Sequence, residues 1–111
     1  MNWGFTKTYN RVKYPVPPQL PGNYAIYSLD IFSRERKLLY IGTSYDLKRR
    51  LDTHPIYSIL KTILTPNEIP IFKIKTISNP EERFSLEKKL ISRLNPPLNK
   101  IYRTDDGGLN G

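Results

Sequence analysis

The chain is short, basic and free of cysteine. Its 111 residues fit one domain, because single domains are commonest at about 100–150 residues. Eighteen lysines and arginines against ten acidic residues give a net charge of +8, which favours a polyanionic partner such as nucleic acid. The absence of cysteine excludes disulfides, thiolate metal sites and zinc fingers.

The apolar residues are too scattered for a membrane or secretory segment. Residues 1–15 lack the continuous apolar run of a signal peptide, and no stretch approaches the roughly 18–20 apolar residues that span a bilayer. We therefore expect a cytoplasmic protein that does not bind membranes.

The N-terminal part predicts an arm followed by a hairpin. Residues 1–21 are basic and aromatic and end in "YPVPPQLP", where four prolines favour an extended arm. The aromatic and branched run 23–29 and the run 37–42 predict two antiparallel strands joined by a polar loop. Gly42 is expected to close the second strand.

Two helices and a third strand are predicted next. Ser44 or Asp46 can cap a helix that reaches about Asp52. A second helix should start at Pro55 and bury a stripe with helical spacing, formed by Ile56, Ile59, Leu60 and Ile63. In residues 69–77, apolar side chains and lysines alternate in the middle, which predicts a half-buried strand.

The last helix has clear start and stop signals. Asn79 can act as the N-cap with Pro80 at the first helical position, and the helix should end before Pro96. Residues 101–111 are polar and glycine-rich, and we expect a flexible tail.

Glu87 lies in the middle of the apolar face of this helix. At about 100° per residue, the face is formed by Phe84, Leu86, Leu90, Ile91 and Leu94. A carboxylate there costs several kcal/mol unless it is paired, bound to a metal or open to a cleft. An ion pair with Arg83, four positions earlier, is the plain alternative.

The first helix carries a second set of candidates. If its last turn reaches His54, then Arg50 and His54 share the face that leans toward the domain. Lys48 and Arg49 point elsewhere and form a possible phosphate-attracting surface. The structural alternatives are a solvated basic face and a histidine that only caps the next helix.

These residues together resemble a known family. "GNY" at 22–24, "YIG" at 40–42, an arginine ten residues after Tyr40, and the pair Glu87 and Asn99 resemble the GIY-YIG nuclease superfamily. The resemblance covers residues 22–100 and implies an α+β fold with a small three-stranded antiparallel sheet flanked by helices. The strands and helices predicted above have the same order.

The resemblance also implies roles for individual residues. Tyr24 and Tyr40 would be the two sheet tyrosines of the cleft, Arg50 would neutralise the scissile phosphate, and Glu87 would hold the metal. Asn99 would tie the chain after the last helix back to the site. Gly42 would support the second motif.

Three positions refine or depart from the family pattern. His54 resembles a histidine of the homing-endonuclease-like and some restriction-like branches rather than of the excision-repair subunits. Asn23 replaces the usual apolar middle residue of the first motif. Thr43 stands where one branch tends to have lysine, so the role of that lysine does not transfer.

The expected function is a metal-dependent DNA endonuclease that uses Mg²⁺ or Mn²⁺. A hard cation held by one carboxylate and several waters suits magnesium. Tyr40 is the candidate general base, and His54 is its rival because the ordinary pKa of histidine is better placed. In 111 residues we expect no appended DNA-binding domain. The chain would then cut with loose sequence preference, recognise a DNA structure, work as a homodimer or with a partner domain, or be a catalytic fragment of a larger protein.

A second hypothesis is a catalytically inactive nucleic-acid-binding module with the same fold. Its basic charge and surface aromatics would serve binding equally well. A buried carboxylate argues against a pure binder. A structural interaction protein is the third and weakest option, because it leaves the net charge unexplained.

Overall fold

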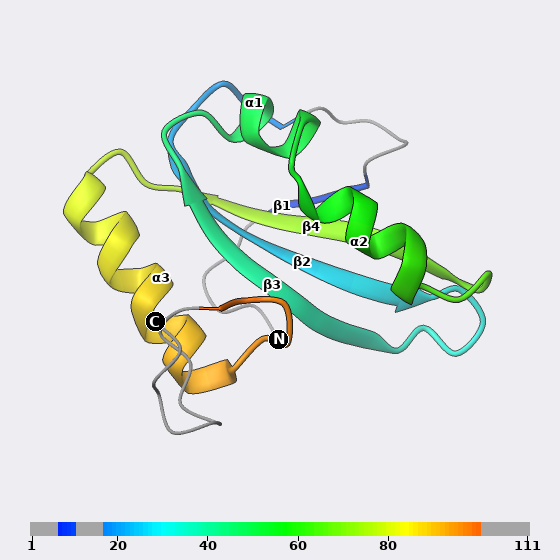
Figure 1. Cartoon of the computed structure of the whole chain (residues 1–111). Helices are drawn as coiled ribbons and strands as arrows, with labels where there is room; N and C mark the ends of the chain where they lie inside the picture. The colour runs from blue at the N-terminus through cyan, green and yellow to red at the C-terminus, as the bar shows by residue number, and fades with distance from the viewer. Residues whose placement is uncertain (1–6, 11–16, 101–111) are drawn as a thin grey trace.

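A computed structural model describes residues 7–10 and 17–100 of the chain. Four strands and three helices are present in this described part (Figure 1). Their bounds in chain order are β1 Lys7–Asn10, β2 Gly22–Asp30, β3 Arg36–Ser44, α1 Leu47–Asp52, α2 Ile56–Ile63, β4 Glu68–Thr76 and α3 Pro80–Leu94. The predicted tail lies outside the described residues.

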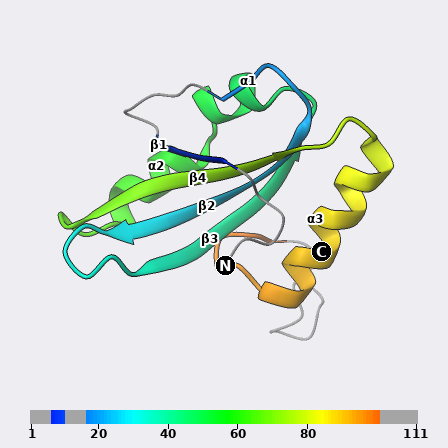
Figure 2. The same cartoon turned by 180° about the vertical axis from the view of Figure 1, so that it is seen from behind.

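The three predicted strands form an antiparallel sheet, which confirms the predicted fold class. Strand β2 lies in the middle and pairs with β3 on one side and β4 on the other. Strand β1, from the segment predicted as an extended arm, adds a fourth strand beside β4, and the sheet order is β1-β4-β2-β3 (Figure 2).

Helices cover both faces of this sheet. Figure 1 shows α1 and α2 on one face and α3 on the other. The buried residues of the first face are Tyr24, Ile26, Leu39, Leu47, Leu51, Ile56, Leu60, Phe72 and Ile74. Those of the second face are Ala25, Tyr27, Ile41, Ile71, Leu90 and Ile91. The middle of β4 alternates as predicted, with Phe72 and Ile74 buried and the two lysines partly exposed, while Ile71 on the lysine side is buried in the second cluster.

A bulge in β3 turns Tyr40 toward the α2 side of the sheet. The pairing of β2 with β3 shifts register between Ile26 and Tyr27, which leaves Leu39 as an extra residue. Leu39 and Tyr40 consequently both pack against the cluster beneath α1 and α2, although neighbouring strand residues normally point to opposite faces. Bulges often redirect side chains next to active sites.

Gly42 lies inside β3, so its predicted place at the end of the strand is wrong. The strand continues to Ser44, and Gly42 stands opposite Tyr24. A Cβ atom at Gly42 would overlap Cζ and Oη of Tyr24. The missing side chain therefore makes room for the ring of the first motif's tyrosine.

Helix α1 is short and depends on its N-terminal contacts. The side chain of Asp46 accepts a hydrogen bond from the Arg49 amide, as the predicted cap requires. The carbonyls of Leu20 and Pro18 accept hydrogen bonds from the amides of Leu47 and Lys48. The proline-rich segment thus holds the helix that carries Arg50.

Two predicted apolar faces are narrower than expected. In α2, Ile56 and Leu60 are buried, whereas Ile59 and Ile63 are both 45% exposed. In α3, Phe84 is 56% exposed. Only Ile56 and Leu60 of the α2 stripe are buried in the core. The start of α3, which carries Phe84, projects past the end of the sheet (Figure 1).

The ends of α3 follow the prediction. Asn79 accepts a hydrogen bond from the Glu82 amide, and Pro80 is the first residue of the helix. Asn95 ends the helix in the left-handed conformation with φ of 46°, one residue before Pro96. This geometry sends the following segment back across β3.

Candidate active site

A cleft of about 330 Å³ lies between α2, α3 and the segment after α3. Tyr40, Arg50, His54, Glu87 and Asn99 line it, so five residues singled out in the sequence converge on one concave surface. The remaining lining residues are Pro55, Ile56, Ile59, Ile91, Leu98 and Lys100. Its polar groups therefore share the cleft with an apolar part.

Tyr24 lies beneath the cleft and not on its wall. Its side chain is 1% exposed, and its ring stacks on that of Tyr40 with 6.2 Å between ring centroids. The Tyr24 hydroxyl lies 2.8 Å from Nε2 of His54 and accepts a hydrogen bond from Nε of Arg50 at 3.4 Å. Tyr24 thus contacts three residues of the cleft wall while its own side chain is buried beneath them.

The surroundings of His54 fix its tautomer. Helix α1 ends at Asp52, so His54 is not in its last turn; it lies between the two helices and is 4% exposed. Its Nδ1 accepts a hydrogen bond from the Ile56 amide at 3.0 Å, which places the proton of the neutral ring on Nε2. Nε2 therefore donates to the Tyr24 hydroxyl.

His54 should make the stability of the fold depend on pH. Burial, aided by the Arg50 charge, lowers the pKa of His54 to about 4 from its usual 6.5. Between these values the unfolded chain binds more protons, so the free energy of unfolding falls as the pH falls. We expect a loss of about 2 kcal/mol between pH 7 and pH 5, measured by urea unfolding.

The control for this prediction is His54→Asn, which does not titrate. The pKa of Glu87 is raised by burial and contributes the opposite slope, but Glu87 is present in both proteins and cancels in the comparison. Equal pH slopes for the wild type and the variant would show that His54 is not the source.

Neighbouring groups shift the pKa values of Tyr40 and Tyr24 in both directions. Burial raises the pKa of Tyr40, and the Glu87 carboxylate raises it further. The Arg50 guanidinium and hydrogen bonds from Arg50 and Tyr24 lower the pKa of Tyr40. Burial, with the neighbouring Tyr40, also raises the pKa of Tyr24.

Glu87 is half-buried and faces the cleft. Among the described residues it forms no ion pair and no hydrogen bond, and burial raises its pKa. The alternative pair with Arg83 is not formed. Arg83 is 7% exposed and instead donates from Nη1 to the carbonyls of Ile77 and Ser78 at 3.2 and 2.9 Å.

Asn99 joins the segment after α3 to the edge of β3. Its side-chain amide accepts from the Ile41 amide and donates to the Ile41 carbonyl, both at 2.8 Å. The Asn99 side chain thus forms the two hydrogen bonds that the backbone of a neighbouring strand would form with Ile41. These bonds place residues 96–100 along the wall of the cleft. Asn99 therefore binds β3 directly beside Gly42 of the second motif.

Lys48 and Arg49, the predicted phosphate-attracting residues, lie at different places relative to the cleft. Arg49 lines a hollow of about 270 Å³ that shares Arg50 with the cleft, and its Nη1 donates to the Tyr45 hydroxyl at 2.9 Å. Lys48 forms an exposed ion pair with Asp52 at 3.8 Å. Of the two, Arg49 is the better placed for a substrate that extends from the cleft.

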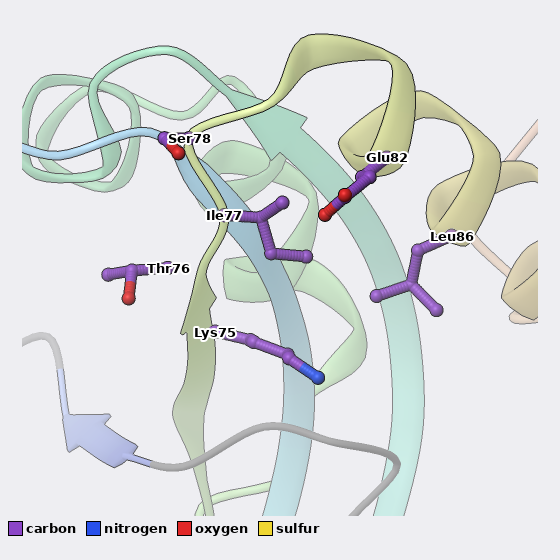
Figure 3. Close-up of a pocket in the computed structure, with 6 residues that line it drawn as sticks. All are labelled: Lys75, Thr76, Ile77, Ser78, Glu82 and Leu86. Carbon is purple, nitrogen blue, oxygen red and sulfur yellow. The ribbon is translucent and has the colours of Figure 1, made fainter.

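A third hollow, of about 480 Å³, lies where β4 passes into α3. Figure 3 shows Lys75 extending from β4 and Glu82 reaching over Ile77 from α3. Among its lining residues, none belongs to the predicted set. The smaller cleft, which holds the tyrosine, arginine, histidine and carboxylate, is therefore the candidate active site.

Two contributors to the site were not recognised in the sequence. Asn23 is fully buried, and its Nδ2 donates to the Arg83 carbonyl at 3.0 Å, which ties β2 to the helix that carries Glu87. A polar residue replacing the family's apolar one was the available signal. Ile59 lines the cleft although its spacing predicted a core residue.

The fold is a small α+β domain, and its cleft brings together a tyrosine, an arginine, a histidine and a glutamate. The family model of the GIY-YIG catalytic domain matches residues 23–101 of this chain. The chain therefore belongs to the GIY-YIG family. The branch suggested by His54 stays a prediction.

Curated relatives share this region of the chain. UvrABC system protein C of Helicobacter pylori strain G27 is 30% identical over 98 residues, covering 78% of this chain and 16% of that protein. UvrABC system protein C of Anaplasma phagocytophilum strain HZ is 33% identical over 98 residues, covering 81% of this chain and 14% of that protein. The chain thus matches only about a sixth of the length of these relatives.

Two further comparisons bear on the chain. No solved structure gives a significant match. Among the residues that the structure describes, no helix has both the length and the apolar character needed to cross a membrane.

Proposed function

We propose that this chain is a metal-dependent endonuclease that hydrolyses phosphodiester bonds in DNA, with one divalent cation held at Glu87. The observation that carries the proposal is the meeting of Glu87 with Tyr40, Arg50 and His54 in one cleft. The net charge of +8 favours a polyanionic substrate.

The residues of the cleft fit a hard cation such as Mg²⁺ or Mn²⁺. Glu87 offers a carboxylate that forms no ion pair with any cation of residues 7–10 or 17–100. In the described part of the chain, no group of three or more His, Cys, Asp or Glu side chains comes together. A single carboxylate with water and substrate oxygens suits magnesium, which retains much of its hydration. When bound, the cation supplies positive charge against the phosphoryl oxygens and offsets the charge of Glu87.

Arg50 is the proposed phosphate-binding residue. Its side chain lines the cleft, and its Nε bonds to the Tyr24 hydroxyl, which orients the guanidinium group. A fixed guanidinium is suited to the charge that develops on phosphoryl oxygens during hydrolysis. Arg49, in the adjoining hollow, would contact the same strand outside the cleft.

Tyr40 is the proposed general base. It lines the cleft, whereas both ring nitrogens of the rival, His54, are occupied by the Ile56 amide and the Tyr24 hydroxyl. Burial raises the pKa of Tyr40, and the hydrogen bond from Tyr24, which itself accepts one from His54, partly offsets this rise. His54 would therefore act as a positioning residue for the two tyrosines.

Cleavage of supercoiled plasmid, run beside a binding assay on the same DNA, tests the proposal. With Mg²⁺ or Mn²⁺ we expect nicked or linear products, and with EDTA we expect binding without cutting. Binding without cutting under every metal condition would instead support an inactive nucleic-acid-binding module of the same fold.

A further inference from the structure

The cleft contains an apolar wall that phosphodiester hydrolysis does not explain. Ile59 is 45% exposed and lines the cleft beside Pro55, with Leu98 from the segment after α3. Covering an exposed isoleucine with another apolar surface is favourable in free energy, because both surfaces are removed from water. The wall therefore favours an apolar part of the substrate.

The cleft also contains positively charged groups, which suit a different part of a substrate than the apolar wall does. Arg50 and Lys100 are its cations, and they suit the phosphate of a nucleotide. A phosphate gains nothing from an isoleucine side chain. The apolar parts of a nucleotide are the deoxyribose and the faces of the base, so these would contact Ile59.

The cleft is larger than a phosphate group alone requires. Its 330 Å³ is more than a phosphate group fills and compares with the smallest pockets that bind small molecules, at about 300 Å³. The cleft therefore has room for more of a nucleotide than its phosphate. In a duplex, moreover, the faces of each base are covered by its neighbours, whereas an unpaired base offers both faces.

We infer that the cleft binds an unpaired nucleotide, with its phosphate at Arg50 and a face of its base against Ile59. This inference rests on the proposed function and specifies its substrate class: DNA in which the nucleotide at the cleavage site is not paired. Such DNA avoids the unpairing that a complete duplex would require.

Helix α2 provides a matched control for Ile59. Ile63 lies one turn further along the same helix and is also 45% exposed, but it does not line the cleft. Ile59→Asn and Ile63→Asn make the same chemical change without adding charge. Thermal unfolding of both variants checks that each remains folded.

Binding is measured in a Glu87→Gln chain, so that the DNA stays intact. The probes are a paired duplex and the same duplex with one short unpaired stretch that contains 2-aminopurine. We expect the unpaired DNA to bind at least tenfold more tightly, with a change in 2-aminopurine fluorescence. Ile59→Asn should reduce this preference at least fivefold, and Ile63→Asn should leave it within twofold.

Two results would overturn the inference: equal affinity for both DNAs, or the same effect from both isoleucine variants. Cleavage by the wild type separates this inference from the proposed function. Cutting of paired and unpaired DNA at equal rates removes the inference and leaves the nuclease. A binding preference that depends on Ile59, without cutting by the wild type, removes the nuclease and leaves the binding site.

Discussion

Replacement of Glu87 by glutamine is expected to slow DNA cleavage roughly 10²- to 10³-fold, the effect of removing one well-placed electrostatic group. Glutamine keeps the size of the side chain but loses the charge that would hold the cation. DNA binding should stay within about twofold or tighten slightly, because the variant removes a negative charge from a cleft lined by Arg50 and Lys100. Single-turnover cleavage and a binding titration on one labelled DNA measure both effects.

Glu81→Gln is the control for this variant. It makes the same charge change in the same helix, but Glu81 is exposed and does not line the cleft. Its cleavage rate should match that of the wild type. If both glutamine variants lose activity equally, the loss follows from net charge and the assigned role of Glu87 is wrong.

Gly42→Ala is expected to damage stability and activity together. The new methyl group would overlap the Tyr24 ring, which is almost fully buried and cannot move aside freely. Overpacking in a core typically costs about 1–3 kcal/mol. Any shift of Tyr24 also displaces the hydroxyl that bonds to Arg50 and His54. We expect cleavage to fall about 100-fold at temperatures where the variant is folded.

A double-variant cycle with Tyr24→Leu tests the cause. On that background the ring is gone, so the added methyl group should cost less free energy of unfolding than in the wild type. An equal cost on both backgrounds would place the defect in the β3 backbone instead of the contact with Tyr24. Urea unfolding supplies the four free energies.

The sequence was a good guide wherever a local signal decides the structure. Asp46, Asn79 and Pro96 mark helix boundaries because capping and proline geometry depend on neighbouring residues alone. Strands β2, β3 and β4 likewise follow from short runs of branched and aromatic residues, whereas β1 was expected only as part of an extended arm. The order of these elements, with the motif residues, was sufficient to predict the fold class.

Features that depend on distant parts of the chain could not be predicted. Helical spacing placed Ile59 in a stripe, but only packing against the sheet decides how wide a stripe is covered. The same spacing suggested an ion pair between Arg83 and Glu87. The carbonyls of the preceding turn, at Ile77 and Ser78, bind Arg83 instead and leave Glu87 facing the cleft.

The site shows the same limit. The bulge that turns Tyr40 toward the cleft has no signal in the residues around Leu39. For His54, capping and a place in the site were weighed as alternatives. The structure combines them, since Nδ1 caps the Ile56 amide while Nε2 reaches Tyr24.

The most direct test of the central claim is a titration of Mn²⁺ into the chain bound to a non-hydrolysable DNA analogue, followed by electron paramagnetic resonance. The account predicts one bound ion per chain in the wild type and in Glu81→Gln, and a large loss of affinity in Glu87→Gln. Equal binding of Mn²⁺ by the wild type and Glu87→Gln would contradict the claim that this cleft is a metal-dependent nuclease site built around Glu87.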